Sequence, residues 1–428
     1  YFSPDGRNLG GGGNTQLAAG GMNAAPTRFQ AAKGLKDSLQ LMYDDTYGGG
    51  KKQAVPGLVD VLVQNSAASV DYLTSLGADM SDVGRMGGAS VDRCHRPTGG
   101  EAVGHHIVHV LRSNAIQRKL DLRTHSQVVK VFTAPNGRVS GVLVRNKIGE
   151  LYSIEAPVVV LASGGFSSNL ARVASYRPEY AAFSSTNQPG ATGDGLDLAL
   201  AIGAQLVDMK EIQIHPTQAA GSKILITEAV RGNGAILVNR KGARFVNELT
   251  TRDAASAAIL RQPGGTAFLV FDEAIRRSLK QIEGYYHLEL VREGDTPEAL
   301  ARAIGADPGT LAATINTYNL AQAAKVDAEF KRANMPRPIN KPGFIAIEVR
   351  PGIHYTMGGV AIDTRTRVLG VNGQPLPGVF AAGEVTGGVH GANRLGGNSI
   401  SETISFGRIA GREAVAYAKG MRDLKLRG

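Results

Sequence analysis

Two apolar stretches of this chain run directly into glycine turns, and this feature restricts the possible folds most. Residues 156–162 are apolar throughout and end in Ser163-Gly164-Gly165, while the apolar stretch 378–382 runs into Gly383-Glu384. Strands that are apolar on both faces are typical of buried sheets, and glycine lets the backbone turn sharply or approach a ligand. The chain has 55 glycines in 428 residues. We therefore expect an α/β protein whose backbone passes close to a ligand.

Composition and charge exclude several other classes of protein. The single cysteine, Cys94, excludes a disulfide framework, a Cys-rich zinc or iron–sulfur site and a C-x-x-C-H haem attachment. The net charge of +10 is spread along the chain and tryptophan is absent, so we expect no nucleic-acid partner. No run of about 18 apolar residues occurs, so no membrane span is predicted. No metal site is predicted either.

The pattern of apolar residues divides the chain into three expected segments. Residues 1–210 contain helical stretches and, around Asn136-Gly137, a strong hairpin signal between two strands of period two. Residues 211–350 alternate helices with charged loops and are interpreted as an inserted domain. Residues 351–428 return to a buried strand and close with an amphipathic helix from about residue 401 to 419.

Three glycine-rich turns stand at junctions between strands and helices. They are Gly12-Gly13-Asn14-Thr15 with Ala18-Ala19-Gly20-Gly21, then Gly383-Glu384, then Gly396-Gly397-Asn398-Ser399-Ile400. A helix N-terminus reached through glycines can bind a phosphate or an electron-rich ring oxygen. One such turn usually does no more than reverse the chain, but three together favour a nucleotide cofactor.

A second group of residues is polar and basic. It comprises His215, Thr227, Glu228, Arg231, Arg252, His354 and Arg394. Because a buried arginine is costly unless it meets an anion, such a group suits a dicarboxylate or a phosphate. Each arginine taken singly is more often part of a surface ion pair. Cys94 stands beside His95 but is expected to be a small buried residue without a catalytic role.

Several motifs carry a resemblance to a known family, in order from residue 12 to residue 418. They are Gly12-Gly13-Asn14-Thr15, Leu17-Ala18-Ala19-Gly20-Gly21-Met22-Asn23, His95-Arg96-Pro97-Thr98-Gly99-Gly100, Ser185-Thr186-Asn187-Gln188-Pro189-Gly190, His215-Pro216-Thr217, residues 227–234, Thr250-Thr251-Arg252-Asp253, His354-Tyr355-Thr356-Met357-Gly358-Gly359, and residues 383–399. These motifs resemble the flavoprotein of soluble fumarate reductases of the flavocytochrome c type. That group lies within the wider succinate dehydrogenase and fumarate reductase flavoprotein family.

The resemblance implies a Rossmann-like FAD-binding domain in two segments, 1–210 and 351–428, with a capping domain inserted at 211–350. The FAD contacts that it implies are Asn14, Thr15, Ala19, Gly20, Val128, Asp194, Glu384, Ser399 and Ile400. Membrane-bound relatives attach the flavin to a histidine, and Asn14 stands at the matching position. Non-covalent FAD is therefore expected.

Two departures from the family pattern lead to further expectations. The chain contains no G-x-G-x-x-G, and residues 1–6 do not resemble the end of such a unit, so we expect that the N-terminal βαβ start is lacking. No haem is expected in this chain. Electrons would then come from a separate donor, such as a cytochrome or a reduced flavin.

The resemblance also implies a reaction, the FAD-dependent reduction of fumarate to succinate. Arg394 and His354 would hold one carboxylate of the substrate, and His215 and Thr227 the other. Arg252 stands at the position of the family's proton donor, with a relay implied through Glu228 and Arg231.

Two alternative functions and the cellular compartment remain open at the level of the sequence. The chain could reduce another unsaturated acid, such as urocanate or methacrylate, although cationic and hydroxyl groups at both ends of the site disfavour a monocarboxylate. It could also be a flavin-free, inactive binding remnant. Relatives of the flavocytochrome type work in the periplasm, but a single cysteine is equally compatible with the cytoplasm.

Overall fold

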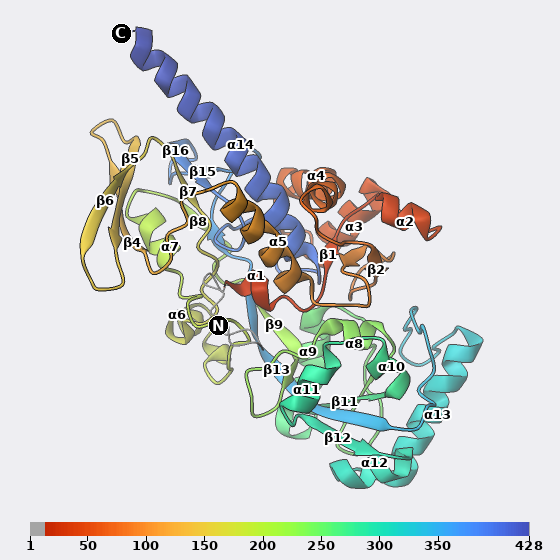
Figure 1. Cartoon of the computed structure of the whole chain (residues 1–428). Helices are drawn as coiled ribbons and strands as arrows, with labels where there is room; N and C mark the ends of the chain where they lie inside the picture. The colour runs from red at the N-terminus through yellow and green to blue at the C-terminus, as the bar shows by residue number, and fades with distance from the viewer. Residues whose placement is uncertain (1–12, 428) are drawn as a thin grey trace.

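The computed structural model describes residues 13–427, so the expectations for residues 1–12 lie outside the described residues. Figure 1 shows two bodies of mixed helix and strand. One contains the first part of the long C-terminal helix α14 (Asn398–Arg427), and the other contains one end of strand β13 (Phe344–Thr356). β13 belongs to both bodies, because Phe344 lies in one hydrophobic core and Ile353 in the other.

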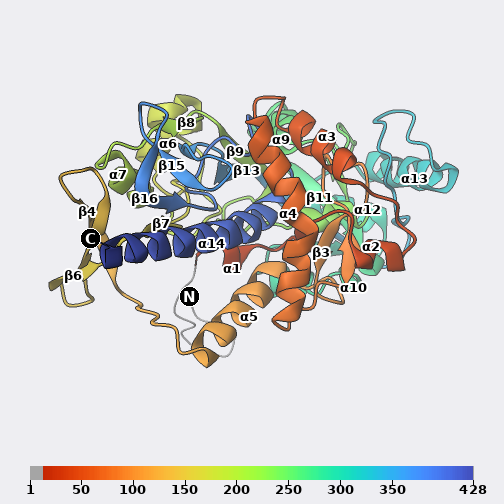
Figure 2. The ribbon, with the colours of Figure 1, turned by 90° about the horizontal axis from the view of Figure 1, so that it is seen from above.

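The first body begins with a series of helices and strands. They are α1 (Asn14–Leu17), β1 (Met22–Asn23), α2 (Arg28–Ala32), α3 (Leu39–Gly49), α4 (Pro56–Ser75), β2 (Asp82–Gly84), β3 (Cys94–Arg96) and α5 (Val103–Gln117). Pro56 at the first position of α4 starts that helix without losing a hydrogen bond. Figures 1 and 2 both show α4 against the first half of α14, where the Ser69 and Ser405 hydroxyls lie 2.9 Å apart.

The chain then forms the predicted hairpin and several further elements of the first body. These are β4 (Gln127–Thr133), β5 (Val139–Arg145), β6 (Leu151–Glu155), β7 (Val159–Leu161), α6 (Leu170–Tyr176), α7 (Asp194–Leu200) and β8 (Leu206–Val207), joined later by β14 (Gly359–Val360), β15 (Arg367–Leu369) and β16 (Pro375–Ala381). β4 and β5 pair antiparallel across the Asn136-Gly137 turn, which confirms the hairpin.

One prediction about the strands needs correction. The apolar run 156–162 contains the strand β7, but β7 pairs only with β16 among the described residues and is an edge strand of its sheet. Val160 is 41% exposed, so the strand is not buried on both faces. An apolar pattern cannot distinguish a central strand from an edge strand, because strand pairing depends on residues far away in the sequence.

The second body is built on an antiparallel sheet of five strands, β10-β11-β13-β12 with β9 paired to β13. Its elements are β9 (Ile212–Ala219), α8 (Glu228–Gly232), β10 (Ile236–Val238), α9 (Arg252–Leu260), β11 (Ala267–Asp272), α10 (Glu273–Arg277), α11 (Ile282–His287), β12 (Val291–Gly294), α12 (Pro297–Ile304) and α13 (Pro308–Ala324). Every residue of β11 is buried, since the strand lies between β10 and β13 and its apolar residues belong to the core of the second body.

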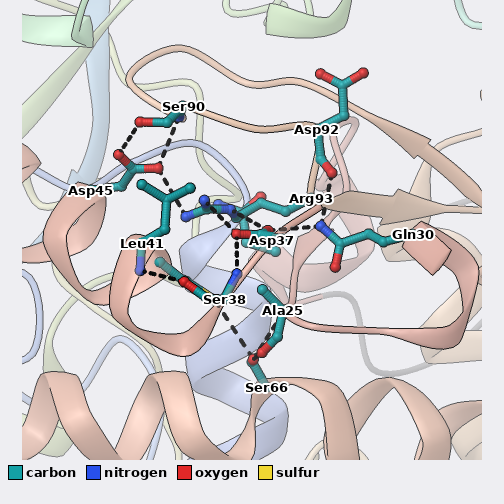
Figure 3. A network of polar contacts seen from close by, with 12 residues as sticks. Ala25, Gln30, Asp37, Ser38, Leu41, Asp45, Ser66, Ser90, Asp92 and Arg93 are labelled. Atoms are coloured by element: carbon teal, nitrogen blue, oxygen red, sulfur yellow. Dashed lines mark hydrogen bonds and ion pairs between the residues drawn. The ribbon is translucent and has the colours of Figure 1, made fainter. Parts of the chain in front are cut away.

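A buried arginine braces the first body, as Figure 3 shows. The Arg93 guanidinium donates to both carboxylate oxygens of Asp37 at 3.0 Å and pairs with Asp45 at 2.9 Å. Asp37 also accepts a hydrogen bond from Gln30 at 2.7 Å. Two carboxylates therefore satisfy this buried charge, as the cost of burying a cation requires.

Candidate active site

Strand β9 presents three polar side chains to one side of the sheet. Gln213, His215 and Thr217 alternate along the strand, so they share a face, and all three are buried. Gln213 Nε2 donates to Asn393 Oδ1 and to the carbonyl of Arg394, both at 2.7 Å, while its Oε1 accepts from Arg252 Nη1 at 3.1 Å. Gln213 thus joins the second body to the segment that precedes α14.

Arg252, Glu228 and Arg231 form a buried charged cluster beside this strand. Arg252 Nε donates to Glu228 Oε2 at 2.7 Å, and Arg231 Nη2 lies 3.7 Å from the same oxygen. The other Glu228 oxygen accepts from the backbone N–H of Gly87, which belongs to the first body. Burial raises the pKa of the Glu228 carboxyl, but Arg252, Arg231 and the Gly87 N–H outweigh burial, so the pKa lies below its ordinary value.

The hydrogen bonds of His215 define its tautomer. The backbone N–H of Thr217 donates to His215 Nδ1 at 3.2 Å, so Nδ1 is an acceptor. Burial, followed by the charge of Arg252, holds the pKa of His215 well below its usual range. A neutral imidazole with an acceptor at Nδ1 carries its proton at Nε2. His215 is therefore a neutral hydrogen-bond donor through Nε2.

His354 and Arg394 approach His215 from a different part of the chain. The His215 and His354 rings lie 5.0 Å apart, and His354 Nδ1 is 2.7 Å from the hydroxyl of Thr186. Burial and the charges of Arg252 and Arg394 hold the pKa of His354 well below its usual range. Arg394 is 2% exposed, and its buried Nε has no hydrogen-bond partner in the part of the chain that the structure describes. Neutral imidazoles and unpaired guanidinium groups are suited to bind an anion.

Thr227 lies where the two bodies meet. Its hydroxyl donates to the carbonyl of Ala19 at 3.3 Å, and the same oxygen caps α8 by accepting from Ala229 N. The Thr227 N–H donates to the phenol oxygen of Tyr285 at 2.9 Å. The helix that carries Glu228 and Arg231 is therefore oriented through Thr227.

Two of the predicted cofactor residues, Asn14 and Glu384, lie at the carboxyl end of a parallel strand pair. β7 and β16 run parallel, and Ser163-Gly164-Gly165 follows one while Glu384 follows the other. A Cβ at Gly165 would lie 2.5 Å from Glu384 Oε1, so the two turns touch. Asn14 Nδ2 lies 3.5 Å from Glu384 Oε2. Ligands of open α/β sheets bind at such carboxyl ends.

The remaining cofactor residues fall into two groups. Thr15, Ala19 and Gly20 are half-buried beside Asn14, and Ser399 and Ile400 lie in the first turn of α14. Asp194 accepts from Gln127, the neighbour of Val128, at 3.3 Å. Among residues 13–427, no hydrogen bond or ion pair joins Asp194 or Val128 to Asn14, Glu384 or Ser399.

We call the turns that contain residues 14–20, residues 163–165, Glu384, Ser399 and Ile400 the cofactor cradle. Burial determines the charge of Glu384 within it. Desolvation by burial raises the pKa of its carboxyl to about 7, against hydrogen bonds from the Thr356 N–H and Asn14 that lower it. Within residues 13–427, the Oε1 atom of Gln16 on α1 is buried without a hydrogen-bond partner. The cradle thus offers half-buried backbone groups, an unsatisfied acceptor and the positive end of a long helix, a set that fits a flavin nucleotide.

Several residues at the site were not identified from the sequence. Gln213, Gly87 and Tyr285 were missed, and Thr186 was noted only as part of a motif. Period two along β9 could have indicated Gln213, because it shares a face with His215. The other three residues reach the site only through contacts distant in sequence, and no local signal identifies them.

The fold is that of a mixed α/β protein, and its candidate site combines a buried cluster of arginines and histidines with a glycine-rich cradle at the ends of two parallel strands. Residues 7–400 match the model of the family described as FAD binding domain. The chain belongs to this family, and within it to the fumarate reductase flavoproteins, which are FAD-dependent oxidoreductases. The resemblance found in the sequence is thereby confirmed.

Particular relatives are similar over most of the chain. Fumarate reductase (cytochrome) of Shewanella frigidimarina is 52% identical over 408 residues, which cover 95% of this chain and 72% of that protein. Urocanate reductase of Eggerthella lenta is 33% identical, covering 95% of this chain and 69% of that protein. The solved structure of the open conformation of a flavocytochrome c3 fumarate reductase superposes with a TM-score of 0.75 at 47% identity, covering 95% of this chain and 72% of that one.

Two further observations bear on possible partners. None of the helices within residues 13–427 has the length and apolar content needed to span a bilayer. In the same residues, no group of three or more His, Cys, Asp or Glu side chains is placed to hold a metal ion. Cys94 lies on β3 of the first body but packs into the hydrophobic core of the second body, and burial raises the pKa of its thiol to about 12.

Proposed function

We propose that this chain reduces the carbon–carbon double bond of fumarate to give succinate, with FAD as its cofactor. One observation carries the proposal. Arg252 and Arg394 are buried together with two neutral histidines, next to the cofactor cradle. Two cations and the neutral Nε2–H donor of His215 suit a dianion better than a substrate with one carboxylate. The 52% identity to a protein named fumarate reductase supports the same substrate.

Each end of the site would hold one carboxylate. Arg394 and His354 would bind one of them, and His215 Nε2–H with the Thr227 hydroxyl would bind the other. Because these donors come from two bodies of the protein, they would orient the alkene between them. Fixed charges in a buried site stabilise the charge that develops on the substrate during attack, without reorganisation.

The proton would come from the charged cluster. FAD, when bound and reduced, supplies the hydride that one alkene carbon accepts. Arg252 would give a proton to the other carbon, and Glu228 would return one to Arg252 across their 2.7 Å contact. Arg231, which is fully buried and donates to the Glu248 carbonyl, would link Glu228 towards the solvent that resupplies the proton. The charge of Arg231 would also stabilise the Glu228 carboxylate after Glu228 has given its proton to Arg252.

We propose that FAD is held without a covalent bond, because Asn14 is the side chain that faces Glu384 and an amide is a poor nucleophile for such a bond. The proposed contacts are those of the cradle, with Asp194 and Val128 reached through a separate part of an extended cofactor. Electrons would come from a separate donor, such as a cytochrome or a reduced flavin.

The division into domains is also a proposal. We propose that residues 211–350 form the capping domain over a cofactor-binding domain made of residues 1–210 and 351–428. The separate hydrophobic core of the second body supports this division. His215, Thr227 and Arg252 would then lie on the cap, and His354 and Arg394 on the other side of the substrate.

Two measurements test the proposed function. The purified chain should take up FAD, seen as a yellow protein with flavin absorbance that persists after desalting. Reduced chemically, it should turn over fumarate far faster than urocanate or methacrylate. A preference for urocanate would transfer the proposal to that acid. A chain that stays colourless with added FAD would favour an inactive binding remnant.

A further inference from the structure

Arg394 differs from the other buried arginines among residues 13–427 in having no carboxylate within 4.0 Å. Arg93, Arg252 and Arg332 contact a carboxylate at 2.7–3.0 Å, and Arg96 and Arg231 also have one within range. Arg394 Nη1 donates only to the carbonyl of Leu395 at 3.1 Å. An unpaired buried cation is costly, so another group must compensate for the lost hydration.

The aromatic ring of Tyr355 supplies that compensation. The central carbon of the Arg394 guanidinium lies 4.3 Å from the centroid of the Tyr355 ring. A guanidinium over an aromatic face is attracted by the electron density of the ring, more strongly when both groups are desolvated. The contact leaves the edge of the guanidinium, including the unpartnered Nε, available for hydrogen bonds.

A second layer of buried groups holds the ring itself. The Tyr355 hydroxyl donates to Glu402 Oε2 at 2.7 Å. Glu402 also contacts His390 Nε2 at 2.8 Å and accepts from the Thr386 hydroxyl at 3.1 Å. All four side chains of this layer are buried. Because α14, β13 and the loop between β16 and α14 each contribute to it, the layer fixes the ring relative to the whole first body.

We propose that Tyr355, held by Glu402, is the positioning residue that keeps the Arg394 guanidinium in place for a substrate carboxylate. Tyr355 acts through Arg394 and does not itself meet the substrate. Pre-organised binding groups increase affinity because less freedom is lost on binding. The inference rests on the proposed function, in which Arg394 holds one carboxylate of a dicarboxylate.

Substitutions at position 355 separate the ring face from the hydroxyl. Tyr355→Leu removes the face, and we expect it to weaken succinate binding about 10- to 30-fold by calorimetry on the FAD-loaded chain. The KM for fumarate should rise by a similar factor, with a smaller change in kcat because the Arg252–Glu228 contact is untouched. Tyr355→Phe keeps the face and should bind succinate within about threefold of wild type.

A readout without ligand makes the test independent of the substrate. Phenylglyoxal labels arginines that are mobile and accessible, and mass spectrometry can follow the peptide that contains Arg394. Labelling of Arg394 should increase in Tyr355→Leu and stay low in Tyr355→Phe. Tyr417→Leu is the matched control, because Tyr417 also packs against an element of the first body, with its ring 6.3 Å from that of Phe380. It should change neither succinate binding nor labelling.

The outcomes distinguish the two levels of the proposal. Unchanged labelling in Tyr355→Leu, or equal weakening of succinate binding by Leu and Phe, would overturn the role of the ring. A wild-type chain that neither binds succinate nor reduces fumarate would overturn the proposed function. In that case the labelling result would still decide whether Tyr355 positions Arg394.

Discussion

Burial sets the protonation of the individual residues at this site. Both histidines are neutral near pH 7, since burial and the neighbouring arginines hold the pKa of each imidazole well below its ordinary value. Arg394 remains charged, although burial and then Arg252 lower its pKa to about 10. The site therefore presents fixed cations and neutral donors over the whole physiological pH range.

Arg252 should be essential for proton delivery rather than only for binding. We expect Arg252→Ala to lower kcat about 10²- to 10⁴-fold, the usual contribution of a positioned acid. Succinate should still bind, because the donors at both ends remain. Arg252→Lys keeps a charge that can donate a proton, so it should restore a small rate that depends on pH. Steady-state kinetics and succinate calorimetry give both quantities.

An exposed arginine of the second body provides the control for that experiment. Arg292→Ala on β12 should leave both kcat and KM unchanged. If Arg252→Ala retained substantial kcat and mainly raised KM, Arg252 would be a carboxylate clamp. The acid role would then return to His354 or to a bound water.

Glu384 should make the stability of the flavin-free chain depend on pH. Its ordinary pKa is 4.5, and burial raises the folded-state pKa to about 7. The folded state therefore binds the proton more tightly than the unfolded state does. The free energy of unfolding should consequently fall as the pH rises from about 4.5 to 7. Glu384→Gln should flatten this part of the curve, measured by urea denaturation across that range. An identical slope in both proteins would contradict the burial argument.

At the scale of elements, the turn into α14 is the junction most sensitive to side-chain size. Gly397 has φ of +89°, and a Cβ there would collide with the amide of Asn23, which bonds to Gly396 O at 2.8 Å and Asn398 Oδ1 at 2.7 Å. Gly397→Ala should therefore lower the free energy of unfolding by about 1–3 kcal/mol. The same change should weaken FAD retention, because Ser399 and Ile400 follow directly. Urea denaturation and fluorescence titration with FAD measure the two effects.

Gly411 lies in the same helix and provides a control. A Cβ at Gly411 would meet no atom within 4 Å. Gly411→Ala should raise stability by up to about 1 kcal/mol, because alanine favours the helix. If the two substitutions had equal effects on stability, the collision at Gly397 would not be the cause.

At the scale of the whole molecule, the contacts between the two bodies predict a closing motion. Glu228 accepts from the Gly87 N–H, Gly88 N donates to the Leu249 carbonyl at 3.2 Å, and Thr227 contacts Ala19. These few contacts lie beside the proposed substrate site. Saturating succinate should therefore slow amide hydrogen exchange in residues 85–90 and 227–232, as closure excludes water. Exchange in the hairpin strand β5 should not change. Unaltered exchange at both contact segments would remove the basis for a lid.

Much of the fold was predictable because its signals are local. The Asn136-Gly137 hairpin and the C-terminal helix α14 follow from turn chemistry and periodicity. The final helix begins at Asn398 and is longer than expected, because its ends are set by packing and by the glycine turn. The edge position of β7 was not predictable, since it depends on which strands are available to pair.

The sequence by itself determined which chemical groups this protein can bring to a substrate and to which family it belongs. Short motifs such as His215-Pro216-Thr217 and Gly396-Gly397-Asn398 carry that information, because residue type and spacing are local properties. Only the tertiary structure decided how the groups act. Arg93 is neutralised by Asp37 and Asp45, whereas Arg394 lies unpaired on Tyr355. Both are arginines in the sequence, and the difference arises because a buried charge is governed by partners that only folding brings within reach.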